Sequence, residues 1–195
     1  MGVKKSFSFA YSPANSNVNW FSLPYVSKYR RASDIAADLG PTRTDVIGKW
    51  DPVNQRAVVY YYARGRWRGT DFSISAGDGL YLSILQSFDW NLAGTDANVT
   101  LTFTPNPPPK SSVFWTGIQY TGIYAKASDI SGELGSANIT EVGLWNPATQ
   151  SAFRWYWDGS AWTGTDFAFE PGAGIYLIIR SDFTWRPIPI TPYVP

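Results

Sequence analysis

The chain repeats itself at a constant spacing of 95 residues, and this duplication constrains the fold more than any other feature. Trp20 recurs as Trp115, and the alignment runs without a gap from Val18 to Asn91. The matched segments include Ala32-Ser33-Asp34-Ile35 with Ala127-Ser128-Asp129-Ile130, Trp50-Asp51-Pro52 with Trp145-Asn146-Pro147, and Gly69-Thr70-Asp71-Phe72 with Gly164-Thr165-Asp166-Phe167. A fixed period indicates a tandem duplication in which both copies form the same structural unit. We therefore predict two homologous domains, residues 1–97 and 98–195.

Each copy alternates apolar and other residues along its strands. Val58, Tyr60 and Tyr62 correspond to three aromatic residues, Phe153, Trp155 and Trp157. Because successive side chains of a strand point to opposite faces, we expect this set to face a core. The other alternate set includes Arg154 and Asp158, so the other face meets solvent, as in antiparallel sheets.

The turn and cap residues of each copy predict an all-β fold with one short helix. Ser33 and Ser128 are expected N-caps, and Gly40 and Gly135 are expected to end the helices. Turn residues separate several short strands in each copy, which favours a sandwich or an open barrel. We predict two tandem, homologous small β-sandwich or partly open barrel domains.

The composition excludes several classes of function. The chain has no His and no Cys, which removes the commonest general base, every Ser–His–Asp triad and Cys-ligated zinc. Lys plus Arg number 16 against 15 Asp plus Glu, which is too balanced for electrostatic binding of nucleic acid or a membrane surface. Met1 is followed by no continuous apolar run, so no signal peptide is visible, and no stretch could span a bilayer. We predict no enzyme, no cofactor and no metal.

Three pairs of carboxylates recur in both copies: Asp34 and Asp129, Asp38 and Glu133, and Asp71 and Asp166. The first pair falls in the first turns of the predicted helices, where the helix dipole favours negative charge. The last pair lies in Gly-Thr-Asp turns, in which Asp bonds its own backbone. Two carboxylates would suffice for glycoside hydrolysis, so a hydrolase stays an alternative that these local roles disfavour.

The repeated motifs support a family resemblance. The Trp-Asp-Pro or Trp-Asn-Pro turn, the aromatic strand, Gly-Thr-Asp-Phe and the following Gly-x-Gly-Leu/Ile-Tyr-Leu resemble small β-rich repeat modules of secreted and cell-surface bacterial proteins. The likeness covers about Val18 to Trp90 and Val113 to Trp185. It implies an appendage-like module without catalysis, placed outside the cell.

Four aromatic residues are candidates for exposed contacts: Tyr61, Trp67, Tyr156 and Trp162. A platform of this kind could stack on sugar rings, which would make the chain a carbohydrate-binding module. Exposed apolar patches on a stable protein more often mark contacts between proteins. The main hypothesis is therefore a non-enzymatic structural subunit that assembles with copies of itself, as an extracellular filament or a component of a virus particle.

Terminal strands offer a route for that assembly. An alternating strand, residues 99–104, precedes a Pro-rich spacer, 105–109, and the second repeat, while the chain ends in a Pro-rich tail. The N-terminal segment alternates in the same way. We expect Phe7, Phe9 and Tyr11 to pack on repeat two of a neighbouring copy as Leu101 and Phe103 pack on repeat one. The alternative is that the N-terminal strand pairs within its own repeat, which would give a monomer.

Charge also differs between the halves of the chain. Residues 1–98 carry 11 Lys plus Arg and 8 Asp plus Glu, a net charge of +3, and residues 99–195 carry 5 and 7, a net charge of −2. Opposite charges on the two halves favour head-to-tail contact between copies.

Overall fold

The protein is all-β, and each repeat forms its own sandwich-like unit. The computed structural model describes residues 2–24, 26–95, 99–108, 112–118, 120 and 123–187. The elements of the first repeat are β1 (Gly2–Phe9), β2 (Val18–Ser22), β3 (Val26–Ser27), α1 (Ala32–Leu39), β4 (Thr44–Asp51), β5 (Arg56–Ala63), β6 (Arg66–Gly69), β7 (Gly79–Ile84) and β8 (Phe88–Thr95). Those of the second are β9 (Leu101–Phe103), β10 (Val113–Gly117), α2 (Ala127–Asn138), β11 (Ile139–Asn146), β12 (Ser151–Trp157), β13 (Trp162–Gly164), β14 (Gly174–Ile179) and β15 (Phe183–Trp185).

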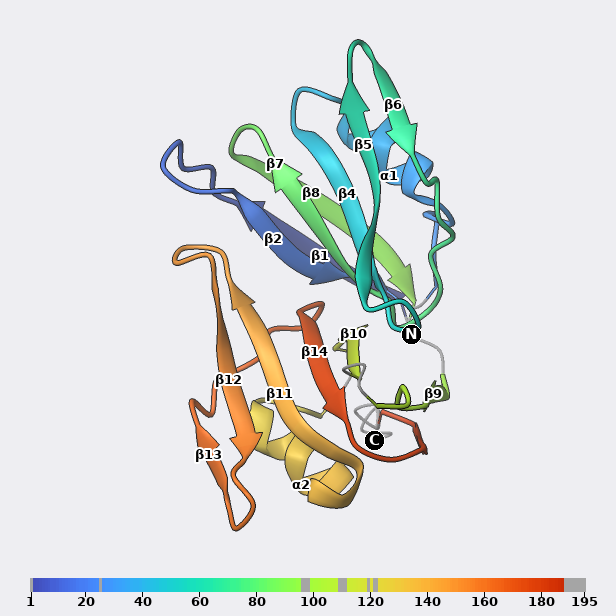
Figure 1. Ribbon diagram of the computed structural model, residues 1–195. Helices are drawn as coiled ribbons and strands as arrows, with labels where there is room; N and C mark the ends of the chain where they lie inside the picture. Colours follow the sequence, from blue (N-terminus) through green and yellow to red (C-terminus); the bar gives the residue numbers. More distant parts are fainter. Residues whose placement is uncertain are drawn as a thin grey trace, which may run out of the picture.

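The same antiparallel sheet recurs in both repeats. Its strand order is β2-β7-β4-β5-β6 in the first repeat and β10-β14-β11-β12-β13 in the second. A smaller sheet packs opposite each one, with the order β1-β8-β3 in the first repeat and β15-β9 in the second. Figure 1 shows the repeats one above the other, with the hairpins β5–β6 and β12–β13 at opposite ends of the molecule.

Two separate cores lie inside these units. The first core draws its buried residues from Phe9 to Leu92, and the second from Phe103 to Trp185. The helix α1 adds Ala32, Ile35, Ala36 and Leu39 to the first core, a spacing that places all four on one helical face. The boundary predicted between residues 97 and 98, and nearly all of the Pro-rich tail, lie outside the described residues.

Both helices begin two residues earlier than the sequence suggested. Their N-caps are Arg31 and Lys126, while Ser33 and Ser128 lie inside the first turn. The expected serine caps are therefore wrong. The capping comes instead from a carboxylate in a distant turn, described below. Gly40, with φ +71°, ends α1 as predicted.

Candidate functional site: the junction between the repeats

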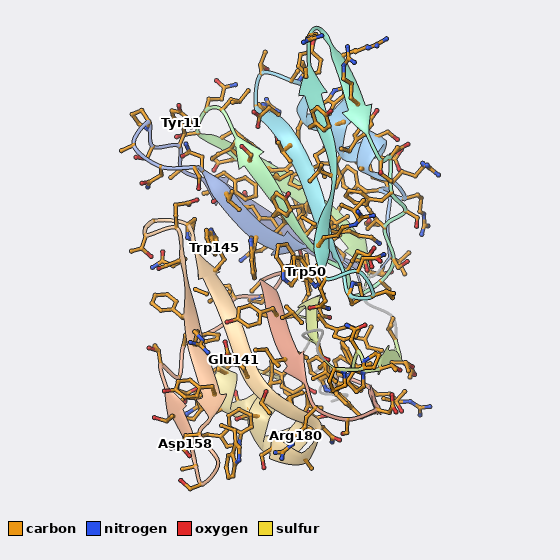
Figure 2. All side chains as sticks on the ribbon, viewed as in Figure 1. Tyr11, Trp50, Glu141, Trp145, Asp158 and Arg180 are labelled. Carbon is orange, nitrogen blue, oxygen red and sulfur yellow. The ribbon has the colours of Figure 1, made fainter. Side chains whose placement is uncertain are left out.

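The two repeats meet through a hydrogen bond that occurs twice. The indole Nε1 of Trp50 donates to the carbonyl oxygen of Val113 at 2.8 Å. In the opposite direction, Nε1 of Trp145 donates to the carbonyl oxygen of Val18, also at 2.8 Å. Figure 2 shows both tryptophans at the junction. Since each repeat contacts the other through the same residues, the junction has the reciprocity of a two-fold dimer interface.

A glutamine completes each clamp. Val113 N–H donates to Gln55 Oε1 at 3.0 Å, and Gln55 Nε2 donates back to Val113 O at 3.0 Å. Gln150 makes the same two bonds with Val18, at 3.1 and 3.2 Å. Each side-chain amide thus pairs with the first residue of an edge strand as a neighbouring strand would. Both glutamines have φ +51°, a left-handed conformation that non-glycine residues rarely adopt and that tends to persist where a site requires it.

Four indole rings form a continuous stack across the junction. The ring centroids lie 5.5 Å apart for Trp145 and Trp20, 4.1 Å for Trp20 and Trp115, and 5.4 Å for Trp115 and Trp50. All four side chains are half-buried. Offset and tilted arrangements of this kind suit the aromatic quadrupole, so the stack stabilises the junction beyond the area it buries.

Glycine permits the close approach of the two backbones. Gly117 N–H donates to Gly77 O at 2.9 Å, and Ser22 N–H donates to Gly172 O at 2.8 Å. A Cβ at Gly79 would lie 2.8 Å from the backbone nitrogen of Thr116, which is too close for any side chain. The repeated Gly-x-Gly segment is therefore required by the facing repeat, in addition to the turn that it forms.

The recurring carboxylates hold the two helices and the cores. Asp71 accepts from Ser33 N–H at 2.8 Å and from Arg31 Nε at 2.8 Å, and Asp166 accepts from Ser128 N–H at 2.8 Å. Burial raises the pKa of Asp71, but the bonds from Arg31 and Ser33 outweigh it and hold that pKa below its usual range. Asp71 and Asp166 therefore cap helices that lie 38 residues earlier in the chain, and the expectation that each bonds the backbone of its own turn is wrong.

The carboxylates of Asp38 and Glu133 bind aromatic side chains. Asp38 accepts from Tyr29 OH at 2.5 Å and from Trp90 Nε1 at 2.9 Å. Glu133 repeats this arrangement with Tyr124 OH at 2.6 Å and Trp185 Nε1 at 3.1 Å. Burial raises the pKa of Asp38, yet its hydrogen bonds and the ammonium group of Lys28 together leave the pKa below its ordinary value.

One charged cluster occurs in the second repeat alone. The Glu141 side chain is 5% exposed and accepts two bonds from Arg154, at 2.7 and 2.6 Å, and a short one from Tyr176 OH. Burial and the bond to Glu141 raise the pKa of Tyr176. Two valines, Val46 and Val59, stand at the corresponding positions of repeat one.

The predicted aromatic contacts divide into two groups. Tyr61 and Tyr156 are exposed, at 38% and 37%, on the solvent-facing side of their sheets. Trp67 and Trp162 are half-buried and pack against the two cores, so the expectation that they are exposed is wrong. Each indole packs on aromatic side chains of the neighbouring strand, Trp67 on Tyr60 and Tyr62, and Trp162 on Trp157.

The terminal strands pair within the chain. Phe9 lies opposite Phe88 in the β1–β8 ladder, and Phe103 lies opposite Phe183 in the β9–β15 ladder. Both Phe9 and Phe103 belong to the core of their own repeat, which corrects the expectation that Phe103 packs on repeat one. Tyr11 is 40% exposed beyond the end of β1.

Two of these terminal side chains also reach the other repeat. A Cβ at Gly77 would lie 2.7 Å from Leu101 Cδ2, and a Cβ at Gly172 would lie 2.8 Å from Phe7 Cζ. Leu101 therefore contacts repeat one as expected, and Phe7 contacts repeat two of its own chain. In this structure β1 pairs with β8 of its own chain, and exchange of β1 between copies stays a hypothesis.

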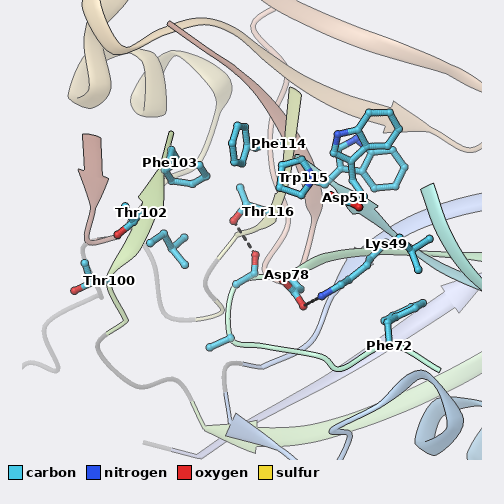
Figure 3. Close-up of a pocket in the computed structure, with 16 residues that line it drawn as sticks. Lys49, Asp51, Phe72, Asp78, Thr100, Thr102, Phe103, Phe114, Trp115 and Thr116 are labelled. Carbon is cyan, nitrogen blue, oxygen red and sulfur yellow. Dashed lines mark hydrogen bonds and ion pairs between the residues drawn. The ribbon is translucent and has the colours of Figure 1, made fainter. Parts of the chain in front are cut away.

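A cavity of about 510 Å³ lies beside the junction, between the sheet of repeat one and strands β9 and β10. Figure 3 shows Lys49 and Asp78 on one side of it and Thr102, Phe103 and Phe114 on the other. Lys49 Nζ donates to Asp78 Oδ2 at 3.0 Å, and both side chains are about one-quarter exposed.

Comparison with protein-family models, with curated proteins and with solved structures finds no match to this chain. Within the ranges that the structure describes, no group of three or more Asp and Glu side chains is placed to hold a metal ion. No helix in those ranges is long and apolar enough to cross a membrane.

Sequence reasoning missed Gln55, Gln150, Lys49 and Asp78. The two glutamines could have been found, because Gln recurs three residues after the proline of both Trp-x-Pro turns. Lys49 and Asp78 could have been found because they differ between the repeats: they are charged where repeat two has Leu144 and Ala173.

Proposed function

We propose that this protein is a non-enzymatic structural subunit that assembles head to tail with copies of itself. The observation that carries the proposal is the placement of two sheet edges, β6 and β13, at opposite ends of the molecule (Figure 1). Each is the last strand of its five-stranded sheet, and among the described residues neither has a partner on its outer side. Such edges present unpaired N–H and C=O groups that another strand can satisfy.

The charges at the two ends support one direction of assembly. Arg64 and Arg66 are exposed at the β5–β6 hairpin, whereas Asp158 is exposed at the β12–β13 hairpin, at the lower end of Figure 2. Like charges would oppose contact between two β6 edges, while β6 of one copy and β13 of the next bring opposite charges together. A contact between unlike ends does not close on itself in pairs, so it propagates as a fibre or closes as a ring.

This proposal moves the contact from the terminal strand to the sheet edges. We propose two settings for such a subunit, an extracellular filament, which the repeated motifs favour, and a virus particle. The carbohydrate-binding alternative loses two of its four aromatic candidates, because Trp67 and Trp162 pack on the cores. The hydrolase alternative gains no observation, since the paired carboxylates cap helices or bind aromatic side chains.

Light scattering coupled to size-exclusion chromatography, with negative-stain microscopy, tests the proposal. We expect concentration-dependent oligomers that shrink as salt rises, because salt screens exposed charges. Reversing the charge of the hairpin with Arg64→Glu and Arg66→Glu should abolish assembly, and adding Asp158→Arg should restore it. Arg30→Glu, an exposed cation before α1, serves as the matched control. A monodisperse monomer at every concentration contradicts the proposal.

Deletion of residues 1–11 separates this interface from strand exchange. If β1 carries the contact, the deletion removes assembly while both repeats stay folded. If the sheet edges carry it, the deleted chain loses stability in repeat one, because Phe9 leaves that core, and the hairpin variants still control assembly.

A further inference from the structure

We propose that the cavity beside the junction binds a neutral sugar ring, at a site formed by Lys49 and Asp78 against aromatic walls. The cavity measures about 510 Å³, within the range of about 300–1,000 Å³ that small-molecule sites occupy. It lies between two structural units and combines apolar walls with a few polar groups, which is how ligand sites are generally built. Its walls include Trp50, Phe72, Phe114 and Trp115.

The residues that line this cavity differ from their counterparts in the other repeat. Lys49, Asp78 and Val58 line it in repeat one, where the corresponding residues of repeat two are Leu144, Ala173 and Phe153. Thr116 completes the wall from the side of β10, and its counterpart in β2 is Phe21. The duplication otherwise preserves the junction, so the polar lining and the space that Val58 and Thr116 leave are specific to one half of the molecule.

The polar groups still have capacity for a ligand. Lys49 Nζ donates to Asp78 Oδ2 at 3.0 Å and to Ser73 O at 2.9 Å, which uses two of its three N–H groups. Asp78 Oδ2 also accepts from Ser75 N–H at 2.9 Å, while its Oδ1 accepts no bond from the described residues. One donor and one acceptor therefore stand side by side at the end of an ion pair.

This combination suits a pair of neighbouring hydroxyl groups. A hydroxyl both donates and accepts, so one could accept from the ammonium group while the next donates to the carboxylate. Bonds to charged partners are the stronger kind. The Lys49–Asp78 pair carries no net charge, which favours a neutral ligand over a phosphate or a carboxylate. The apolar face of a sugar ring would lie on the aromatic wall, leaving its hydroxyls to the ion pair.

A binding assay with defined sugars tests the site. We would titrate the full chain with cellotriose, maltotriose, mannotriose and triacetylchitotriose, following tryptophan fluorescence and saturation-transfer NMR. At least one of them is expected to bind and to change the fluorescence, because Trp50 and Trp115 line the cavity. If none of these neutral sugars binds at millimolar concentration, the proposal is wrong.

The decisive variant gives the cavity the residues of repeat two. Lys49→Leu combined with Asp78→Ala removes both charges together and so leaves no buried charge unpaired. It should weaken sugar binding about ten-fold or more, as expected for the loss of a charge-assisted bond, with circular dichroism unchanged. Tyr61→Ala and Tyr156→Ala, on the exposed sheet faces, should leave binding intact. Loss of binding in the tyrosine variants but not in the cavity variant would overturn the proposal.

Discussion

Trp50 of the first repeat donates a hydrogen bond of 2.8 Å to the backbone carbonyl of Val113, the first residue of β10 in the second repeat. Trp145 and Val18 form its counterpart at the same distance. The Trp-x-Pro segment, which in the sequence looks like a local turn, thus binds an edge strand of the other repeat. The two repeats are arranged like the two subunits of a dimer, joined here in one chain.

The clamp should show strong coupling between its two side chains. Trp50→Phe should lower the free energy of unfolding by about 1 kcal/mol, because Gln55 still donates to Val113 O. Gln55→Ala should also cost about 1 kcal/mol, because Val113 N–H loses its acceptor while Trp50 still donates to Val113 O. Together they should cost about 3 kcal/mol, more than the sum, since Val113 then loses every partner from this clamp. Urea unfolding measures the three values. If the double variant costs no more than the sum of the two single variants, the two side chains act independently.

An isolated first repeat should dimerise. Residues 1–95 retain the first core, Trp20 of the indole stack, and both halves of a reciprocal clamp, which are Trp50 with Gln55 and Val18. A second copy can therefore take the place of repeat two. Light scattering should give twice the mass of the fragment, and the Trp20→Ala fragment should be a monomer. A folded, monomeric wild-type fragment at high concentration would exclude this interpretation of the junction.

The Glu141–Arg154 pair should be costly to break but cheap to replace. Arg154→Val should destabilise the chain by about 1–3 kcal/mol, because Glu141 is buried and loses its charged partner, although solvent at the half-exposed Arg154 moderates the loss. Glu141→Val with Arg154→Val, the residues of repeat one, should lie within about 1 kcal/mol of the wild type. Thermal and urea unfolding of the two variants provide the comparison, and equal destabilisation would contradict it.

Acid should destabilise the fold through carboxylates that act as acceptors. The pKa values of Asp38, Asp71 and Asp166 lie below the usual range, because hydrogen bonds to the ionised forms outweigh burial. Their stabilisation is complete above the unfolded pKa of about 4 and is lost as the pH falls through the lower folded values.

The Asp38→Asn variant should therefore show a weaker fall in stability between about pH 4 and pH 2 than the wild type. It should also be less stable at pH 7, because a charged acceptor for Tyr29 and Trp90 is lost. Urea midpoints measured across this range test both statements, with the exposed Asp182→Asn variant as the control. A parallel fall in all three proteins would assign the acid sensitivity to other groups.

Local patterns in the sequence determined the fold class. The period-two alternation around Tyr60 placed Tyr61 on the solvent face, and the structure confirms this exposure. The glycine at position 40 marked the end of the first helix, which the structure confirms. These features depend on neighbours within a few residues, so they are visible without any tertiary contact. The duplication was equally visible, because its 95-residue period is a property of the sequence alone.

Only the tertiary structure showed which contacts the repeated motifs make, within a repeat and between the two repeats. The cap of α1 comes from Asp71, distant in sequence, so Ser33 looked like the cap when it is the group that is capped. Trp67 is half-buried because it packs on Tyr60 and Tyr62 of the neighbouring strand and against the first core, and the sequence had placed it among exposed residues. The clamp on Val113 and the cavity at Lys49 form where two similar surfaces meet, and the geometry of that meeting depends on the packing of both repeats.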